Sequence, residues 1–271
     1  MSGWRLLLRQ SPTLRVDLRG ITPAALADLS KAEGERLPVG CGNVTLPLVE
    51  FFHVTSDASD ALVFDGDLSR FDRVGWQMAG GRIQVEGSVG HYAGGCMSAG
   101  ELVVKGHAGL LAACEMAGGT LTVEGNVDDF GASTLPGSMD GMRGGSFIVK
   151  GNAGARFGDR MRRGTALVFG DVGDFLASRM VAGTIAVGGR AGAHAGYGMR
   201  RGSVVFATQP APSHSAETFV PALASAEVFW QLLARDLARH GGPFAGLASM
   251  RIERRLGDSA VGGKGELIFA G

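Results

Sequence analysis

Methionine recurs along the middle of this chain at an interval of 19 residues, which is broken once by an interval of 26. A glycine follows each of these methionines three residues later. The pairs are Met78 and Gly81, Met97 and Gly100, Met116 and Gly119, Met142 and Gly145, Met161 and Gly164, Met180 and Gly183, and Met199 and Gly202. A fixed period of this kind predicts a stack of similar structural units.

The content of one unit predicts a strand rather than a helix. Seven residues after the methionine comes valine, or phenylalanine in the last unit, and the segment Arg82–Glu86 alternates as a strand does. Glycine recurs nine residues after all but the last of these methionines, and glycine permits positive φ. The sequence therefore predicts an all-β fold, a right-handed parallel β-helix (solenoid) of about seven or eight coils. The stretch Leu62–Gly66 is expected to be an earlier, degenerate coil, and the Met and Val rows are expected inside.

We expect three regions along the chain. Residues 57–207 form the glycine-repeat β-helix. Residues 1–56 form an N-terminal cap with strands at 4–8, 14–18 and 44–54 and a helix at 23–32. A cap is needed because the open end of a solenoid exposes unpaired backbone groups.

Residues 208–271 are expected to hold an extended segment, an amphipathic helix and a final strand. Pro210, Pro212 and Pro221 mark the extended segment. The helix is predicted at about 226–240, ended by Gly241-Gly242-Pro243, and the strand at 265–269. Phe229, Leu232, Leu233 and Leu237 are predicted to form the apolar face of the helix.

Repeats such as Met78-Ala79-Gly80-Gly81 and Met142-Arg143-Gly144-Gly145, each followed by a strand and Gly-x-x-Gly, resemble a known family. They are similar to the glycine-repeat β-helix of the formylmethanofuran dehydrogenase C subunit and of the glutamate synthase C-terminal domain. The layout of the whole chain resembles the former. Arginine outnumbers lysine 22 to 4, which favours the bacterial branch, the C subunit of the formyltransferase/hydrolase complex.

This resemblance implies a cytoplasmic four-subunit assembly in one-carbon metabolism. It implies transfer of a formyl group from formyl-tetrahydromethanopterin to a methanofuran-type carrier, with release of formate. The implied partners are the metal-binding, hydrolase-like A component, the molybdopterin-binding-like B component and the formyltransferase D component. The chemistry, the carrier and the metal ions belong to those partners, so the resemblance implies no catalytic residue and no cofactor bound by this chain alone.

The composition excludes some classes of function. The chain has 26 basic and 26 acidic residues, which argues against a globally basic nucleic-acid binder. No apolar run is long enough to span a membrane. Three cysteines, Cys41, Cys96 and Cys114, predict free thiols in a reducing compartment, and therefore a cytoplasmic protein.

Few residues are candidates for chemistry. His91, His107 and His194 lie 13, 10 and 14 residues after their methionines and so do not stack as metal ligands should. Cys96 and Cys114 fall on neighbouring coils, where two small buried residues are the favoured interpretation. We predict no metal site and no nucleophile.

The charge is unevenly distributed. Residues 76–141 hold 2 basic and 7 acidic groups, whereas residues 142–207 hold 10 and 3. Seven of the arginines lie within two residues of a repeat methionine, and we expect them to line one corner of the solenoid. This corner is either a plain solvated edge or, the interpretation we favour, a surface that faces an anion, which would be an acidic partner surface or the polyglutamate tail of the carrier. They are Arg143, Arg160, Arg162, Arg163, Arg179, Arg200 and Arg201.

The interval of 26 residues predicts a bulging loop within 126–141, which either contacts a partner or is a neutral bulge. Two other functions remain open from the residues. One is a stand-alone glutamate-synthase-like β-helix subunit, which would associate with amidotransferase and flavin subunits. The other is an autonomous solenoid enzyme acting on an anionic polymer, which would need acids, His or Lys in phase along a groove.

Overall fold

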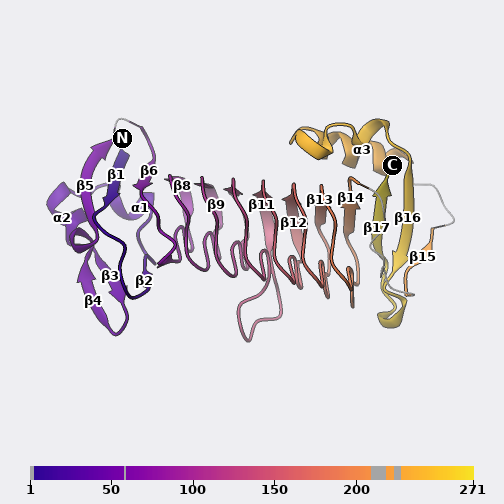
Figure 1. Cartoon of the computed structure of the whole chain (residues 1–271), viewed down its shortest axis with the longest axis horizontal. Helices are drawn as coiled ribbons and strands as arrows, with labels where there is room; N and C mark the ends of the chain where they lie inside the picture. The colour runs from indigo at the N-terminus through magenta and orange to yellow at the C-terminus, as the bar shows by residue number, and fades with distance from the viewer. Residues whose placement is uncertain (1–2, 58, 209–217, 223–226) are drawn as a thin grey trace.

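The computed structural model describes residues 3–57, 59–208, 218–222 and 227–271. The molecule is elongated, with its N-terminal strands at one end and its C-terminal strands and longest helix at the other (Figure 1). Most of the regular structure is β-sheet, and the 13-stranded main sheet has two open edges, at β15 and β5, so it does not close into a barrel. The predicted all-β class is confirmed at this level.

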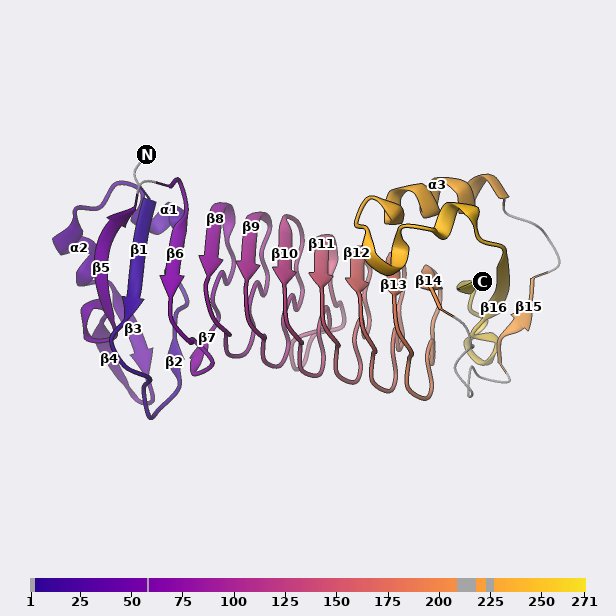
Figure 2. The same cartoon turned by 45° about the horizontal axis from the view of Figure 1, so that its top comes forward.

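The repeat units lie side by side in a row, and each contributes one strand to the main sheet (Figure 2). Neighbouring strands in sequence are neighbours in space and run parallel, with Ile83 opposite Leu102, Leu102 opposite Leu121, and Leu121 opposite Phe147. The strands are β6 (Leu62–Asp65), β8 (Ala79–Val85), β9 (Ala99–Val104), β10 (Thr120–Val123), β11 (Arg143–Val149), β12 (Arg163–Val168), β13 (Thr184–Val187) and β14 (Ser203–Phe206). Residues at the same position of the sequence period therefore lie opposite each other in neighbouring strands. The early unit expected at Leu62–Gly66 also pairs with the next unit.

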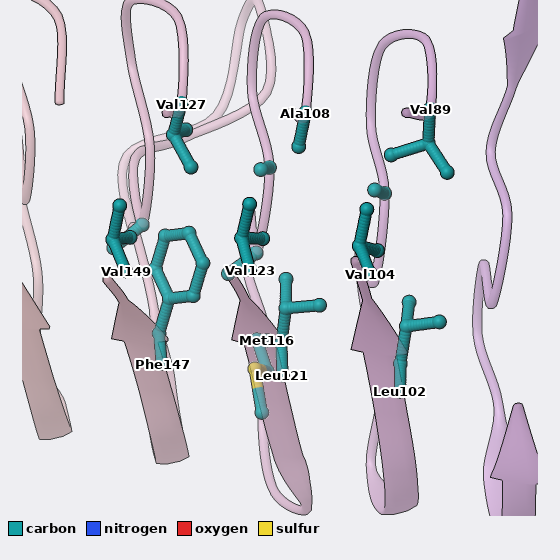
Figure 3. Close-up of a cluster of buried hydrophobic side chains, with 14 of the residues drawn as sticks. Val89, Leu102, Val104, Ala108, Met116, Leu121, Val123, Val127, Phe147 and Val149 are labelled. Carbon is teal, nitrogen blue, oxygen red and sulfur yellow. The ribbon is translucent and has the colours of Figure 1, made fainter. Parts of the chain in front are cut away.

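A second line of contacts joins the units away from these strands. Single parallel bridges connect Val89 to Ala108, Ala108 to Val127, and Val127 to Ala153, with one residue from each unit. Side chains from the two lines fill the interior between them (Figure 3). The seven repeat methionines are each at most 1% exposed, and the valines seven residues after them are fully buried, as predicted.

Two glycine positions recur along the repeat, the second in all units but the last, and they are required for different reasons. Gly119, three residues after its methionine, has φ of +78°, and a Cβ there would lie 2.5 Å from Met97 Cε and 2.6 Å from the carbonyl oxygen of Gly100. Gly125, nine residues after the methionine, has no positive φ, but a Cβ there would lie 2.6 Å from the carbonyl oxygen of Gly106. The first position therefore needs both the conformation and the space, and the second needs only the space.

The N-terminal strands extend the main sheet and add a small second one. β1 (Gly3–Leu8) pairs in parallel with β6 and in antiparallel fashion with β5 (Phe52–Asp57). The four-stranded sheet has the order β4-β3-β2-β7 and consists of β2 (Val16–Asp17), β3 (Pro38–Cys41), β4 (Val44–Pro47) and β7 (Phe71–Asp72).

Two N-terminal expectations are corrected in their bounds. The helix expected at 23–32 is two short ones, α1 (Pro23–Leu26) and α2 (Lys31–Glu35), because Ser30 and Glu33 form a capping box that starts a new helix. The strand expected at 44–54 is interrupted by the 3-10 turn η1 (Leu48–Glu50).

At the other end, the predicted final strand is β17 (Gly265–Ala270), and the structure pairs it in parallel with β14. β16 (Ile252–Gly257) and β15 (Val220–Pro221) follow in antiparallel fashion. Short 3-10 turns lie at η2 (Gly242–Phe244), η3 (Leu247–Ser249) and η4 (Ser259–Val261). Pro210 and Pro212, part of the expected extended segment, lie outside the described residues, and Pro221 belongs to β15.

Helix α3 (Glu227–Ala238) covers the outer face of the sheet near its C-terminal end (Figures 1 and 2). The predicted apolar face of this helix is wrong in part. Trp230, Ala234 and Leu237 are buried against the outward side chains of β12 to β14, whereas Phe229 is 44% and Leu232 65% exposed. The apolar residues of α3 are distributed over more than one face of the helix, so the sequence alone does not show which face is buried. Packing against the sheet buries the face that contains Trp230.

Replacing Gly119 with Val should lower the free energy of unfolding by several kcal/mol, because the side chain meets the preceding unit and the backbone is left-handed. Gly137→Val is the matched control. Gly137 also has positive φ, of +84°, but a Cβ there meets nothing within 4 Å, so only the conformational cost of about 1–2 kcal/mol applies. Urea unfolding followed by circular dichroism measures both, and equal losses would contradict the close stacking of units.

Candidate functional site: an arginine cluster beside an inserted loop

The three repeat histidines have contacts that explain them without a metal. His91 Nδ1 accepts a hydrogen bond from the Leu110 backbone N–H at 3.0 Å, and His107 Nδ1 accepts one from Asn126 at 2.8 Å. Asn126 and Asp171 perform the same function in later units with a carbonyl or carboxylate oxygen. His107, Asn126 and Asp171 share one position of the repeat and form a row of acceptors for backbone N–H groups of the next unit, whereas His91 belongs to a second such row, with Asp129 and Asp174, three residues further along.

His194 instead stacks on Phe175, with ring centroids 4.8 Å apart. Within residues 3–57, 59–208, 218–222 and 227–271, no group of three or more His, Cys, Asp or Glu side chains is placed to hold a metal ion.

The two neighbouring cysteines are close, as the spacing suggested. The Cys96 backbone N–H donates to the Cys114 carbonyl, and both thiols are free. Burial raises the pKa of the Cys114 thiol strongly, with Cys96 and Glu115 adding to the effect. Burial, reinforced by Glu115, also raises the pKa of Cys96. Both therefore remain protonated at neutral pH and are poor nucleophiles.

Four of the seven predicted arginines have carboxylate partners, which the sequence reasoning missed. Arg162 pairs with Asp140, and Arg143 lies 3.8 Å from Glu115. The third acid, Asp159, is 4% exposed, and Arg179 binds both of its carboxylate oxygens, at 2.9 and 3.1 Å. The Ser178 hydroxyl donates to Asp159 at 2.8 Å, and Arg160 Nε lies 3.9 Å from it. The only sequence signal for these pairs was the position of the three acids next to the repeat methionines.

The remaining three arginines have no ion-pair partner in the part of the chain that the structure describes. Arg163, Arg200 and Arg201 are exposed and, with Arg162, surround a shallow cavity of about 370 Å³ whose floor includes Val181 and Ala182. Arg162 and Arg163 follow one repeat methionine directly, and Arg200 and Arg201 follow another; we call these the two arginine pairs. The unit between them carries Val181 and Ala182 at the equivalent positions. The pairs are therefore two unit spacings apart, about 10 Å.

The 26-residue interval forms a loop that leaves the repeat after Ala132 and returns at Met142. It protrudes from the lower edge of the row in Figure 1. Loop residues are held back against the units. Leu135 N–H donates to Glu115 Oε1 at 3.2 Å, and Arg160 Nη1 donates to the Ser138 carbonyl at 3.3 Å. The predicted bulge is confirmed, and the loop lies against two of the seven predicted arginines, Arg160 and Arg162. We call the seven predicted arginines the arginine cluster.

A structure similar to this chain is the crystal structure of the formyltransferase/hydrolase complex FhcABCD from Methylorubrum extorquens with methylofuran. One of its chains matches with a TM-score of 0.91 and 42% identity, covering 98% of this chain and 99% of that chain. The C subunit of the same organism's complex is 46% identical over 85 residues, 31% of this chain and 32% of the relative. The C subunit of the molybdenum-containing formylmethanofuran dehydrogenase 1 of Methanosarcina barkeri is 38% identical over 90 residues, 31% of this chain and 30% of the relative. The match to these curated relatives thus spans about a third of their length.

This chain belongs to the C-subunit family of formyltransferase/hydrolase complexes and formylmethanofuran dehydrogenases. No protein-family model matches the sequence. The resemblance inferred from the glycine repeats is therefore confirmed. Among the described residues of this C-subunit family member, no helix is both long and apolar enough to cross a membrane.

Removing Arg179 should destabilise the protein by about 2–3 kcal/mol, because it leaves the buried Asp159 carboxylate with the Ser178 hydroxyl as its main partner. The cost stays below that of a fully buried pair, since the Arg179 side chain is 42% exposed. Arg163→Ala removes an exposed side chain and should change stability by no more than about 0.5 kcal/mol. Comparing the unfolding free energies of R179A and R163A measures the difference, and equal values would show that Asp159 does not depend on Arg179.

Stability should fall in mild acid because His91 must be neutral to accept the Leu110 hydrogen bond. Burial, assisted by Arg15, lowers the pKa of His91, although Asp72 opposes the effect. The unfolded chain, with a histidine pKa of about 6.5, then binds more protons than the folded one. The stability is present above that pH and is lost as pH falls through the lower folded pKa. Urea unfolding from pH 7.5 to 5 should show a smaller loss in His91→Asn, and an unchanged slope would refute this role.

Proposed function

We propose that this protein is a structural subunit of a formyltransferase/hydrolase complex, in which it joins components equivalent to A, B and D. The observation that carries this proposal is the likeness, over almost the whole of both chains, to a chain of the FhcABCD complex. In that assembly we expect formyl transfer between formyl-tetrahydromethanopterin and a methanofuran-type carrier, and hydrolysis to formate in the cytoplasm. The carrier and any metal ions would be bound through partner subunits.

We infer a non-catalytic role for this chain from how its reactive side chains are used. His91 and His107 accept backbone hydrogen bonds, and the Cys96 and Cys114 thiols are held protonated by burial. Residues 57–207 would serve as a rigid right-handed parallel β-helix of 19-residue coils. Residues 1–56 and 208–271 would protect its two ends. The in-register parallel pairing of consecutive units supports this arrangement.

The arginine cluster would be the surface that meets an anion. Arg163, Arg200 and Arg201 carry it, since the other four arginines already have carboxylates nearby. Guanidinium groups bind carboxylates through two parallel hydrogen bonds. Arg163 lies two units, about 10 Å, from Arg200 and Arg201, and this arrangement suits a surface with several carboxylates, which an acidic partner subunit or a polyglutamate tail would provide.

Changing Arg163, Arg200 and Arg201 to Ser should weaken complex assembly or raise the KM for the carrier at least tenfold, while the fold is retained. The matched control replaces three other exposed arginines, Arg190, Arg235 and Arg239, and so removes the same total charge. A tagged chain purified gently from its own cells provides the assay, with its partners identified by mass spectrometry.

Three partners of hydrolase, molybdopterin-binding and formyltransferase type are the expected result. Amidotransferase and flavin subunits would instead indicate a glutamate-synthase-like assembly. A lone species of 28.0 kDa would refute the subunit role. Equal effects of the two triple variants would refute a specific arginine surface.

A further inference from the structure

A groove runs along the arginine side of the molecule between two loops. One cavity of about 440 Å³ lies under the inserted loop, and a second of about 620 Å³ continues from it toward the turn at Asp258–Val261. They share Met139, Arg160 and Arg179 as lining residues. The groove crosses about four unit spacings, roughly 20 Å, which is the length of about six residues of extended chain.

The end of the groove under the inserted loop is mainly apolar. Leu111 and Phe130 come from two successive units, and Leu135, Pro136 and Met139 come from the loop. Met139 is 71% and Phe130 37% exposed, so this lining includes apolar surface that the chain leaves in contact with water. Such a hollow accepts a bulky apolar side chain.

The other end carries the charge. Arg162 and Arg200 line it, beside Tyr197, which is 56% exposed, and Asp140, which already pairs with Arg162. Asp258 also lines this end, but its two carboxylate oxygens accept from the backbone N–H groups of Gly198 and Ala260. Arg200 has no ion-pair partner among the described residues, and the open cavity between Arg163 and Arg201 adjoins it. This end therefore attracts carboxylates.

We propose that the groove binds an extended segment of a partner polypeptide that carries a bulky apolar side chain a few residues from two or more acidic ones. The apolar side chain enters between Phe130, Leu135 and Met139. The carboxylates pair with Arg200 and, in the adjoining cavity, with Arg163 and Arg201. Arginine, tyrosine and methionine are the residues that protein interfaces favour. This inference rests on the proposed role as a subunit, and it adds where a partner docks and what the docking segment looks like.

The repeat itself shows how to remove the loop. In an uninterrupted unit two residues separate the alanine or glycine of the last turn from the next methionine, as Ser178 and Arg179 do between Ala177 and Met180. Between Ala132 and Met142 nine residues occupy that place. Deleting residues 134–140 joins Ser133 to Gly141 and restores the 19-residue period, while the Ser133 carbonyl keeps its hydrogen bond from Glu115. The seven deleted residues are not needed for the pairing of β10 with β11.

The test uses the full complex, with a photo-crosslinking p-benzoylphenylalanine placed at Met139 or Tyr197 and, as a control, at Val44. Val44 is 50% exposed and lies in β4 at the other end of the molecule. Irradiation at the groove positions should yield one partner peptide with a large apolar residue and at least two Asp or Glu within about six positions. Capture at the groove should exceed capture from Val44 at least tenfold, and deletion of 134–140 or Met139→Glu should reduce the yield from Tyr197 at least fivefold.

Three results would overturn this inference. They are equal capture from Val44, capture of a peptide without acidic residues, and full capture by the deletion and Met139→Glu variants. Met139→Glu alters one exposed side chain, so it remains informative even if the deletion variant fails to fold. The arginine triple variant separates the two proposals. If it weakens assembly while the groove captures no polypeptide, the subunit role stands and the docking segment does not.

Discussion

The distance between neighbouring units is the constraint on which the rest of this molecule depends. Each unit pairs with the next along a strand and again at a single bridge, so two backbones run in hydrogen-bond contact at two places. At Gly125 this contact leaves 2.6 Å between a hypothetical Cβ and the Gly106 carbonyl oxygen, less than any side chain tolerates. The glycines therefore serve the stacking itself, and the buried methionine and valine rows fill the space that the stacking encloses.

Because each unit repeats its neighbour's path, side chains at one position form a row along the molecule. A row of acceptors satisfies backbone N–H groups and can be built from His, Asn or Asp, as His107, Asn126 and Asp171 show. A row of arginines would repel itself, and the structure reduces that cost by placing Asp159 and Asp140 beside Arg179 and Arg162. The positive charge that remains is concentrated at Arg163, Arg200 and Arg201, where it is available to a partner.

The sequence alone predicted the features that follow from the period, namely the parallel register, the buried rows and the bulge before Met142. It missed features that depend on contacts between distant residues, such as the buried face of α3 and the ion pairs of the arginines. It also missed that Tyr92, Phe175 and other non-glycine residues adopt positive φ. A glycine in a sequence indicates a position that can take positive φ. A non-glycine residue that adopts positive φ because of its neighbours gives no such signal in the sequence.

The inserted loop is informative because it departs from the period at no cost to the stacking. Thr120 still lies opposite Ser146, and Val127 still bridges to Ala153, so the fold would be complete without the seven extra residues. The loop nevertheless buries part of Leu135, supplies Asp140 to Arg162 and makes one wall of the groove. In a molecule whose regular surface is set by stacking, specific recognition has to come from positions that break the repeat. The loop and the turn at Asp258 are two such positions, and with the arginine pairs that lie between them they enclose a single groove.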